Sequence, residues 1–389
     1  MTESTVVQTD LADSEAAGTV LGRQMAAAFG GEAPDAVILF ASPVYDYTVL
    51  LNALHRECAP KILVGCSSAG EFAGATPSGS SACGVAIRST DIGFGVGLGR
   101  GLKEDRLHAV KEMVGTFRGL SDSTYHYRTV LLLTDALAGY TEEFLEHLTL
   151  ETAGRYQVFG GGAGDDAKFS RTHIFRGAEA VTDAAVALEM LSNKPFGIGV
   201  SHGWTPASTA MVVTEADGMR LVSLNATPAV EVFRDHAEDN GQVFNDAEPL
   251  PFFLHNILGI ETPGGYKLRV PLSAEADGSI VCAAEIPAGC TVRIMKASST
   301  SAGDAADRAT KHAMRQVRTD GAPALALFFD CAATRLRMGK DFGSELTRVA
   351  DELGNIQFAG CNTYGQIARI DGQFSGFHNC TAVICIIPE

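Results

Sequence analysis

The chain has few basic residues. Its 389 residues include 30 lysines and arginines against 46 aspartates and glutamates, so the formal net charge is −16 and the sequence pI is near 5.0. Nucleic acids are bound mainly by clustered Lys and Arg side chains, and no such cluster is present. The acidity also disfavours an anionic membrane surface. We therefore expect neither nucleic acid nor membrane among the partners.

Long apolar runs are missing too. No uninterrupted stretch approaches the roughly 18–20 residues that cross a bilayer, and Met1–Thr5 lacks the cationic start of a signal peptide. The nine cysteines are odd in number, with no C-x-x-C pair and no zinc-type spacing, so we expect most of them to be reduced and buried. These absences predict a cytoplasmic protein.

Core material is plentiful, with 46% hydrophobic and 20% charged residues. The length suits two or three domains on the usual expectation of roughly 150 residues each. We predict two lobes, residues 1–215 and residues 216–389.

A short repeat occurs three times in the chain. In each copy, small residues lead to a glycine and then to an acidic or amide side chain. The copies are Val64–Glu71, Phe159–Asp165 and Ala359–Gln366. Before each copy come an apolar run, a span with helical periodicity and a second short apolar run. Each unit therefore predicts a β-α-β crossover with parallel strands, and the fold class is α/β.

The ranges of these predicted elements are as follows. The first strands are Ala36–Ala41, Thr129–Thr134 and Ala324–Phe329, and the helices are Thr48–Cys58, Thr141–Thr152 and Ser344–Leu353. Thr141 and Ser344 are predicted helix caps, and Gly154 and Gly354 are predicted helix stops. Strands are also expected in Cys83–Arg88, Ile92–Gly97, Ala184–Leu188, Gly197–Ser201 and Thr381–Ile387. Residues 218–318 carry no repeat and predict mixed strands and helices.

Glycine at the end of a buried strand allows a ligand to approach the backbone, and α/β sheets bind ligands at the carboxyl ends of their strands. The alternative is that the glycines serve only tight packing. No P-loop or dinucleotide-binding pattern is present, so nucleotide binding is unsupported. The ligand-pocket candidates are Gly65, Cys66, Ser67, Gly70, Glu71, Gly161, Gly164, Asp165, Cys361, Asn362, Thr363 and Gln366.

Two cysteines and two histidines could carry chemistry. Cys66 and Cys361 occupy equivalent repeat positions, and with His378 they could form a nucleophilic pair, although a structural role is the alternative. His202 ends a predicted strand beside Trp204, the only tryptophan, and it could be either a metal ligand or a hydrogen-bonded structural residue. No C-x-x-C-H motif is present, so any haem would be held non-covalently.

The order and spacing of four stretches resemble the landmarks of FIST proteins. They are Val64–Phe72, Phe159–Asp165, Gly197–Trp204 and Gly360–Ala368 followed by Phe377-His378-Asn379. The resemblance covers nearly the whole chain and implies an N-terminal and a C-terminal FIST unit in a sensory protein that binds a small ligand. One departure is that Cys331–Arg335 lacks a glycine expected in FIST proteins.

A stand-alone FIST chain of this kind resembles the nitric-oxide-sensing haemoproteins of the NosP group. This resemblance implies haem b, a diatomic ligand and a partner histidine kinase linked to cyclic-di-GMP signalling. His202 is then the first choice for the iron ligand, with Trp204 as an aromatic wall and His378 second. The alternatives are a FIST sensor for a non-haem metabolite such as an amino acid, and a cysteine-dependent hydrolase or transferase.

Overall fold

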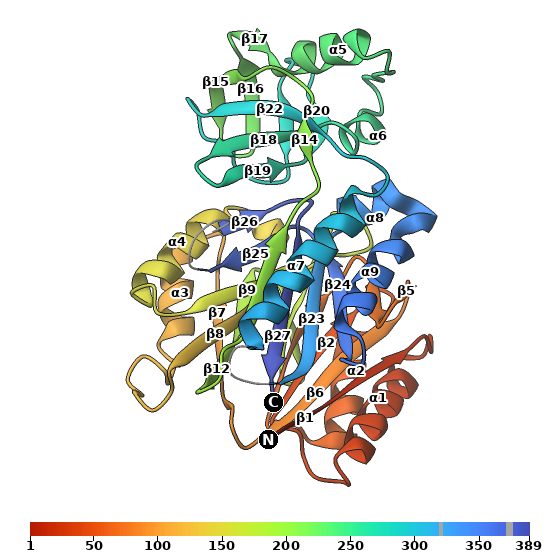
Figure 1. The fold of residues 1–389 in the computed structure, drawn as a ribbon, viewed down its shortest axis with the longest axis vertical. Helices are drawn as coiled ribbons and strands as arrows, with labels where there is room; N and C mark the ends of the chain where they lie inside the picture. The colour runs from red at the N-terminus through yellow and green to blue at the C-terminus, as the bar shows by residue number, and fades with distance from the viewer. Residues whose placement is uncertain (319–321, 371–375) are drawn as a thin grey trace.

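The computed structural model describes residues 1–318, 322–370 and 376–389 (Figure 1). It confirms the α/β class. Three six-stranded sheets form the larger part of the molecule, which we call the body, and a nine-stranded sheet forms a separate part at one end of it.

The body contains three units of the same design. The first comprises β1 (Thr2–Thr9), α1 (Ser14–Ala28), β2 (Ala36–Ala41), α2 (Tyr47–Cys58), β3 (Ile62–Ser67) and β6 (Ala82–Ser89). The second comprises β7 (Gly93–Arg100), α3 (Arg106–Val114), β8 (Tyr127–Thr134), α4 (Thr141–Glu151), β9 (Gln157–Gly162) and β12 (Ala184–Ser192). The third comprises β13 (Gly197–Ser201), α7 (Ser301–Val317), β23 (Pro323–Cys331), α8 (Ala332–Met338), α9 (Gly343–Leu353), β24 (Phe358–Thr363) and β27 (Ala382–Pro388). The predicted parallel pairs are confirmed as β2–β3, β8–β9 and β23–β24.

Each unit also gives a short hairpin to the sheet of another unit. The hairpin of β4 (Glu71–Ala73) and β5 (Thr76–Ser78) extends the third sheet at β24. That of β10 (Ile174–Arg176) and β11 (Glu179–Val181) extends the first sheet at β3. That of β25 (Gln366–Arg369) and β26 (Gly376–His378) extends the second sheet at β9. The exchange is cyclic, so the three units form one interlocked body.

The nine-stranded part, which we call the insert, lies between β13 and α7 in the sequence. Its strands are β14 (Thr205–Pro206), β15 (Met211–Asp217), β16 (Arg220–Leu224), β17 (Thr227–Pro228), β18 (Ile257–Thr262), β19 (Gly265–Arg269), β20 (Pro271–Ala274), β21 (Ile280–Cys282) and β22 (Thr291–Lys296). Its helices are α5 (Ala229–Asp239) and α6 (Leu250–Phe253), and it has its own apolar core. The predicted division at residue 215 falls within β15 and stays a prediction.

Glycines on the edge strands let helices pack directly on the sheets. A Cβ on Gly199 of β13 would lie 1.8 Å from the Ala309 carbonyl oxygen of α7, and one on Gly99 of β7 would lie 2.1 Å from the Ala109 oxygen of α3. A Cβ atom cannot lie this close to a carbonyl oxygen, so only glycine fits at these two positions. The glycines of Gly197–Ser201 therefore serve helix packing.

Two predicted helix caps are wrong. Tyr140 precedes α4, and Thr141 is already its first residue and is buried. The chain enters α9 directly from a 3₁₀ turn at Gly339–Phe342, so Ser344 lies inside the helix and its hydroxyl donates back to the Asp341 oxygen at 2.7 Å. The predicted stops are confirmed, because Gly154 and Gly354 have φ of 69° and 63°.

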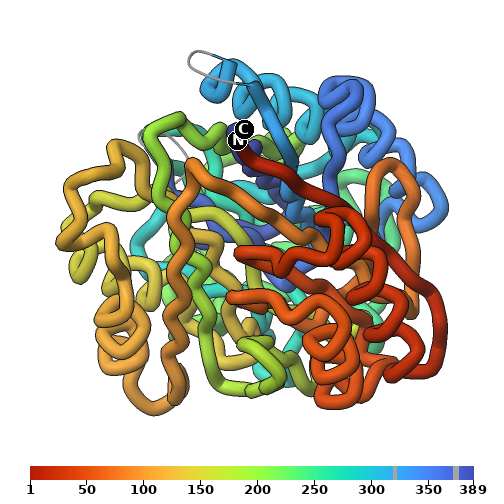
Figure 2. The backbone as a smooth tube through the Cα atoms, turned by 90° about the horizontal axis from the view of Figure 1, so that it is seen from below, coloured from red at the N-terminus to blue at the C-terminus, as the bar shows by residue number. Residues whose placement is uncertain are grey.

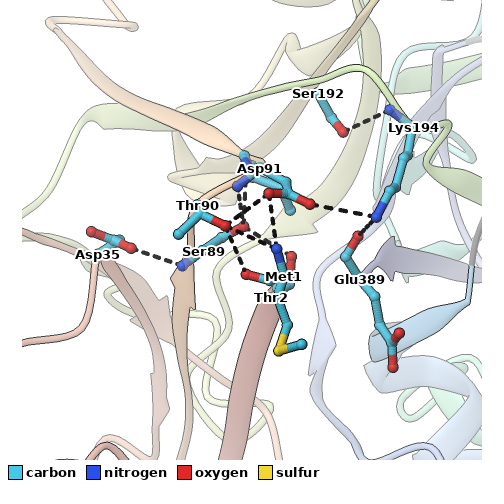
Figure 3. A network of polar contacts seen from close by, with 10 residues as sticks. Met1, Thr2, Asp35, Ser89, Thr90, Asp91, Ser192, Lys194 and Glu389 are labelled. Atoms are coloured by element: carbon cyan, nitrogen blue, oxygen red, sulfur yellow. Dashed lines mark hydrogen bonds and ion pairs between the residues drawn. The ribbon is translucent and has the colours of Figure 1, made fainter.

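The first and last described residues meet at the end of the body away from the insert (Figures 1 and 2). There the Asp91 carboxylate forms ion pairs with the Met1 amino group and the Lys194 ammonium (Figure 3). The two N–O distances are 2.8 Å and 3.5 Å. The Lys194 ammonium also donates to the Glu389 carbonyl oxygen at 2.5 Å. These contacts join the three units at the start of β1 and the end of β27.

Candidate functional site

The three repeated segments come together at the centre of the body. The Ala69 amide donates to the Asn362 oxygen, the Gly164 amide to the Ser67 oxygen, and the Gly162 amide to the Gly365 oxygen, each at 2.9 Å. Each segment therefore bonds to both of the others. The repeat marks the place where the units interlock.

The first glycine of each segment is required for close strand packing. A Cβ on Gly65, Gly160 or Gly360 would lie 2.0, 2.0 or 1.7 Å from a carbonyl oxygen of the neighbouring parallel strand. Gly161 and Gly164 are also closed, since a Cβ would meet Thr363 or Ala69 below 3.0 Å, and a Cβ on Gly70 would displace the guanidinium end of Arg335. At these positions the packing interpretation fits better than ligand access.

Glu71 and Gln366 occupy equivalent positions and make equivalent contacts inside the body. The Gln366 amide donates to the Thr363 hydroxyl at 2.9 Å and its oxygen accepts from the Thr381 amide at 3.2 Å. The Glu71 carboxyl group accepts from the Ser68 hydroxyl, and from the hydroxyl and amide of Ser81. Burial raises the pKa of Glu71 to about 7, against the effect of these hydrogen bonds.

This buried carboxyl gives a testable pH dependence. Between pH 4.5 and 7 the folded chain holds a proton at Glu71 that the unfolded chain releases, so this group's contribution to stability falls as pH rises. We expect Glu71→Gln to raise the free energy of unfolding at pH 8 by about 1–3 kcal/mol and to change it little at pH 4. Urea unfolding of wild type and variant across pH measures the difference. The reverse change, Gln366→Glu, is the matched control and should destabilise most at high pH; equal effects at both pH values would contradict the assignment.

Asp165 holds a turn together. Its carboxylate accepts backbone amides of Phe169, Ser170 and Arg171 at 2.7–2.8 Å and the Tyr364 hydroxyl. Burial opposes ionisation, but these hydrogen bonds prevail and lower the pKa of Asp165. Asp165 also borders a hollow of about 530 Å³ beside α2.

Cys66 and Cys361 are fully buried at the same centre. Burial, and then the neighbouring Cys66, raise the pKa of Cys361 well above its usual value. A thiol that is both closed off and protonated is a poor nucleophile. His378 lies on β26, is 1% exposed, and pairs in register with Gln366. This geometry favours the structural interpretation of the two cysteines over the hydrolase hypothesis.

His202 is positioned by backbone groups. Its Nε2 lies 3.2 Å from the Tyr266 carbonyl oxygen of the insert, and its Nδ1 accepts the Trp204 amide at 3.3 Å. Burial lowers the pKa of His202, so the ring is neutral. Both ring nitrogens therefore already have partners.

A cavity of about 420 Å³ lies between the body and the insert. Most of the body's lining residues lie at or just after the carboxyl ends of β8, β23 and β24, and most of the insert's lining residues are apolar. The body residues are Ala136, Leu137, Gly139, Phe169, Cys331, Ala332, Ala333, Thr363, Tyr364, Gly365 and Asn379. The insert residues are Met219, Leu250, Val270, Leu272, Ser273, Val281, Cys282 and Ala283. Of the predicted pocket residues, only Thr363 lines this cavity.

The sequence predicted neither the insert's share of this wall nor the place of Cys331 in it. From the sequence, Cys331–Arg335 is only a departure from the FIST pattern. The available signal was the position of Cys331, two residues past the predicted strand Ala324–Phe329, because α/β sheets bind ligands at the carboxyl ends of their strands. The insert gave no such signal, because its contribution depends on how it packs on the body.

The predicted haem residues do not fit a haem as they are arranged here. Neither His202, His378 nor Trp204 lines the 420 Å³ cavity. Trp204 borders a separate space of only about 10 Å³, its ring facing the Arg337 guanidinium at 5.4 Å. Within the described ranges, no group of three or more His, Cys, Asp or Glu side chains could hold a metal ion.

Two family models match the chain. The FIST N domain matches residues 35–227 and the FIST C domain matches residues 229–369. The chain belongs to the FIST family. FIST domains are sensory, which gives this protein a sensor role. The junction between the two FIST matches, at residues 227–229, leads into α5 of the insert.

Two mycobacterial relatives of this FIST protein bear the name uncharacterized protein. A protein of Mycobacterium tuberculosis (strain ATCC 25618 / H37Rv) is 24% identical over 373 residues, which is 92% of each chain. One of Mycobacterium bovis (strain ATCC BAA-935 / AF2122/97) is 24% identical over 371 residues, again 92% of each. The solved cyanuric acid hydrolase from A. caulinodans aligns with 100% of this chain and 99% of its own at 10% identity. Its TM-score of 0.33 is too low to establish a shared fold or function. No helix in the described part of the FIST chain is long and apolar enough to cross a membrane.

Proposed function

We propose that this FIST protein is a cytoplasmic sensor that binds a small, mainly apolar molecule in the cavity between body and insert. The observation that carries the proposal is the two-sided wall of that cavity. Its volume of about 420 Å³ is within the range of small-molecule sites, and such sites often lie between two packed parts of a chain. A ligand there contacts both parts, so its binding energy can shift their relative position.

The signal would then pass from the insert to a partner. A histidine kinase linked to cyclic-di-GMP signalling stays our prediction for that partner. Nitric oxide stays a separate prediction, which depends on haem and not on this cavity. The apolar wall of the cavity favours the alternative hypothesis of a non-haem metabolite. An amino acid ligand is less well supported, because the polar atoms of Glu71 and Gln366 are used in hydrogen bonds within the body.

A neutral fluorescent probe tests the cavity. We expect one molecule of N-phenyl-1-naphthylamine to bind per protein chain. Its fluorescence emission should increase on binding, since the cavity is apolar. Ala283→Trp places a large ring inside the cavity and should abolish this binding. Leu336→Trp, at a side chain that is 45% exposed on α8, is the matched control and should bind like wild type. Unchanged probe binding by Ala283→Trp would contradict the proposal.

Haem has a separate spectroscopic test. The prediction requires a Soret band in protein produced with ample iron and haem precursor, and the band should shift or vanish in His202→Ala. If a haem-replete preparation lacks the band even after hemin is added, the predictions of haem and nitric oxide binding are wrong. The proposed ligand site in the apolar cavity is not affected by that result.

A further inference from the structure

A polar hollow lies beside the start of α2, apart from the apolar cavity. Its volume of about 530 Å³ suits a small molecule, and it shares no lining residue with the cavity. Two segments supply most of its wall, residues 43–48 at the start of α2 and residues 165–173 between β9 and β10. A molecule in this hollow therefore contacts only the body.

The charges left without a partner in this wall are positive. Lys168 and Arg171 are exposed, and neither forms an ion pair within the described ranges. The acids of the wall already have donors. Asp165 accepts three backbone amides, and Asp46 accepts the Val49 amide at 3.1 Å as the N-cap of α2. Lys168 and Arg171 are thus available to a negatively charged ligand.

Two buried polar atoms of the same wall also lack partners. Neither the Tyr45 hydroxyl nor the His173 Nδ1 atom has a hydrogen-bond partner in the part of the chain that the structure describes. Tyr45 is only 5% exposed. Buried polar atoms of native proteins are almost always hydrogen-bonded, so such atoms beside a hollow indicate a bound molecule that supplies the missing partner.

The His173 side chain is held in place by its neighbours. Its ring centroid lies 5.0 Å from that of Tyr47, and its backbone amide donates to the Ser67 hydroxyl at 2.8 Å. Burial, and then the nearby Arg171, lower the pKa of His173, so the ring is neutral near pH 7. A neutral imidazole keeps one N–H group, which can donate to a ligand oxygen.

We propose that this hollow is a second ligand site, which binds a small organic oxyanion through Arg171 and Lys168, with Tyr45 and His173 as hydrogen-bond donors. A guanidinium group binds the paired oxygens of a carboxylate or a phosphate ester in the same way, so both belong to this ligand class. The positive end of the 12-residue helix α2 adds to the attraction. The inference goes beyond the proposed function, because this site is separate from the cavity and binds charged molecules.

Isothermal titration calorimetry with phenyl phosphate, benzoate and the uncharged benzyl alcohol tests the proposal. We expect one molecule of phenyl phosphate or benzoate to bind per chain at this site, and the tighter of the two identifies the ligand as a phosphate ester or a carboxylate. Arg171→Ala should weaken that binding at least about tenfold, because a charge-assisted hydrogen bond is lost. Benzyl alcohol should not compete with either anion.

Arg176→Ala is the matched control for charge. Arg176 is an exposed residue of β10 that lies outside the hollow, and its removal lowers the positive charge of the same segment by the same amount. This variant should bind phenyl phosphate like wild type. Equal weakening by Arg171→Ala and Arg176→Ala, or no binding of either anion to wild type, would overturn the proposal.

Tyr45→Phe separates a binding role from a structural one. It removes a buried hydroxyl that has no partner among the described residues, so the free energy of unfolding without ligand should not fall. The affinity for phenyl phosphate should nevertheless fall by about threefold or more. A Tyr45→Phe protein that is less stable but binds the anion normally would contradict the role given to this hydroxyl.

Binding of N-phenyl-1-naphthylamine keeps this proposal distinct from the cavity function. Arg171→Ala should bind that probe like wild type, and saturating phenyl phosphate should not displace it. If the probe binds but neither anion does, only the second site is wrong. If the anions bind but the probe does not, only the cavity function is wrong.

Discussion

Gly360→Ala should destabilise the body by about 3–5 kcal/mol or prevent folding altogether. A Cβ at Gly360 would lie 1.7 Å from the Phe328 carbonyl oxygen and 2.7 Å from a ring carbon of Phe72. Phe328 pairs with Gly360 in the parallel register of β23 and β24, and Phe72 pairs with it from β4. The Phe328 oxygen belongs to the paired backbone and cannot retreat without breaking strand pairing, while the Phe72 ring closes the other side.

Urea unfolding followed by circular dichroism measures this effect. Gly343→Ala is the matched control, because its Cβ would lie 3.7 Å from Pro77, an ordinary contact, at the first residue of α9. We expect the control to change stability by less than about 1 kcal/mol. A Gly360→Ala protein as stable as the control would show that the strands can separate and that the packing interpretation of the repeat is wrong.

Arg269→Met should weaken the attachment of the insert to the body by about 3–5 kcal/mol. Arg269 lies on β19 of the insert, and its side chain is 3% exposed. Its Nη1 donates to the Phe377 carbonyl oxygen of β26 at 3.0 Å, and its Nη2 lies 3.5 Å from the Glu142 carboxylate of α4. Removing the guanidinium leaves that carboxylate with Lys267 as its remaining ion-pair partner, at 2.9 Å, and leaves a buried carbonyl oxygen without this donor.

The expected readout is selective. Hydrogen exchange at β19 and β26 should accelerate in Arg269→Met while exchange within β2 and β3 stays slow, and probe affinity for the cavity should fall. Arg293→Met is the control, since Arg293 pairs with Glu261 on the surface of the insert and contributes little there. If both variants exchange at the wild-type rate, the Arg269–Glu142 ion pair does not hold the insert in place.

The sequence was sufficient for the repeated crossovers but not for their assembly. The apolar run Ala36–Ala41 coincides with β2, and Gly354 ends α9 as expected, because both features are local. The exchanged hairpins escaped prediction because strands such as β4, three residues long, are too short to show alternation. They pair with strands 108 to 290 residues away in sequence, from Ile174 with Cys66 to Glu71 with Cys361.

The candidate site was predicted less well for a related reason. The three segments do converge, but convergence places polar groups such as Glu71 in internal hydrogen bonds rather than in an open pocket. The cavity forms instead where the insert covers the strand ends, and most of its wall residues are ordinary apolar side chains. Single-sequence patterns do not distinguish Val270 in a cavity wall from Val213 in the insert's core.

Hydrogen–deuterium exchange with and without bound N-phenyl-1-naphthylamine tests the central claim most directly. We predict added protection on both sides of the cavity, in residues 136–139, 331–333 and 363–365 of the body and in β20 and β21 of the insert. The hollow beside α2, around Tyr45 and Arg171, should remain unchanged. Protection confined to that hollow, or to one side of the cavity alone, would contradict a ligand site shared by body and insert.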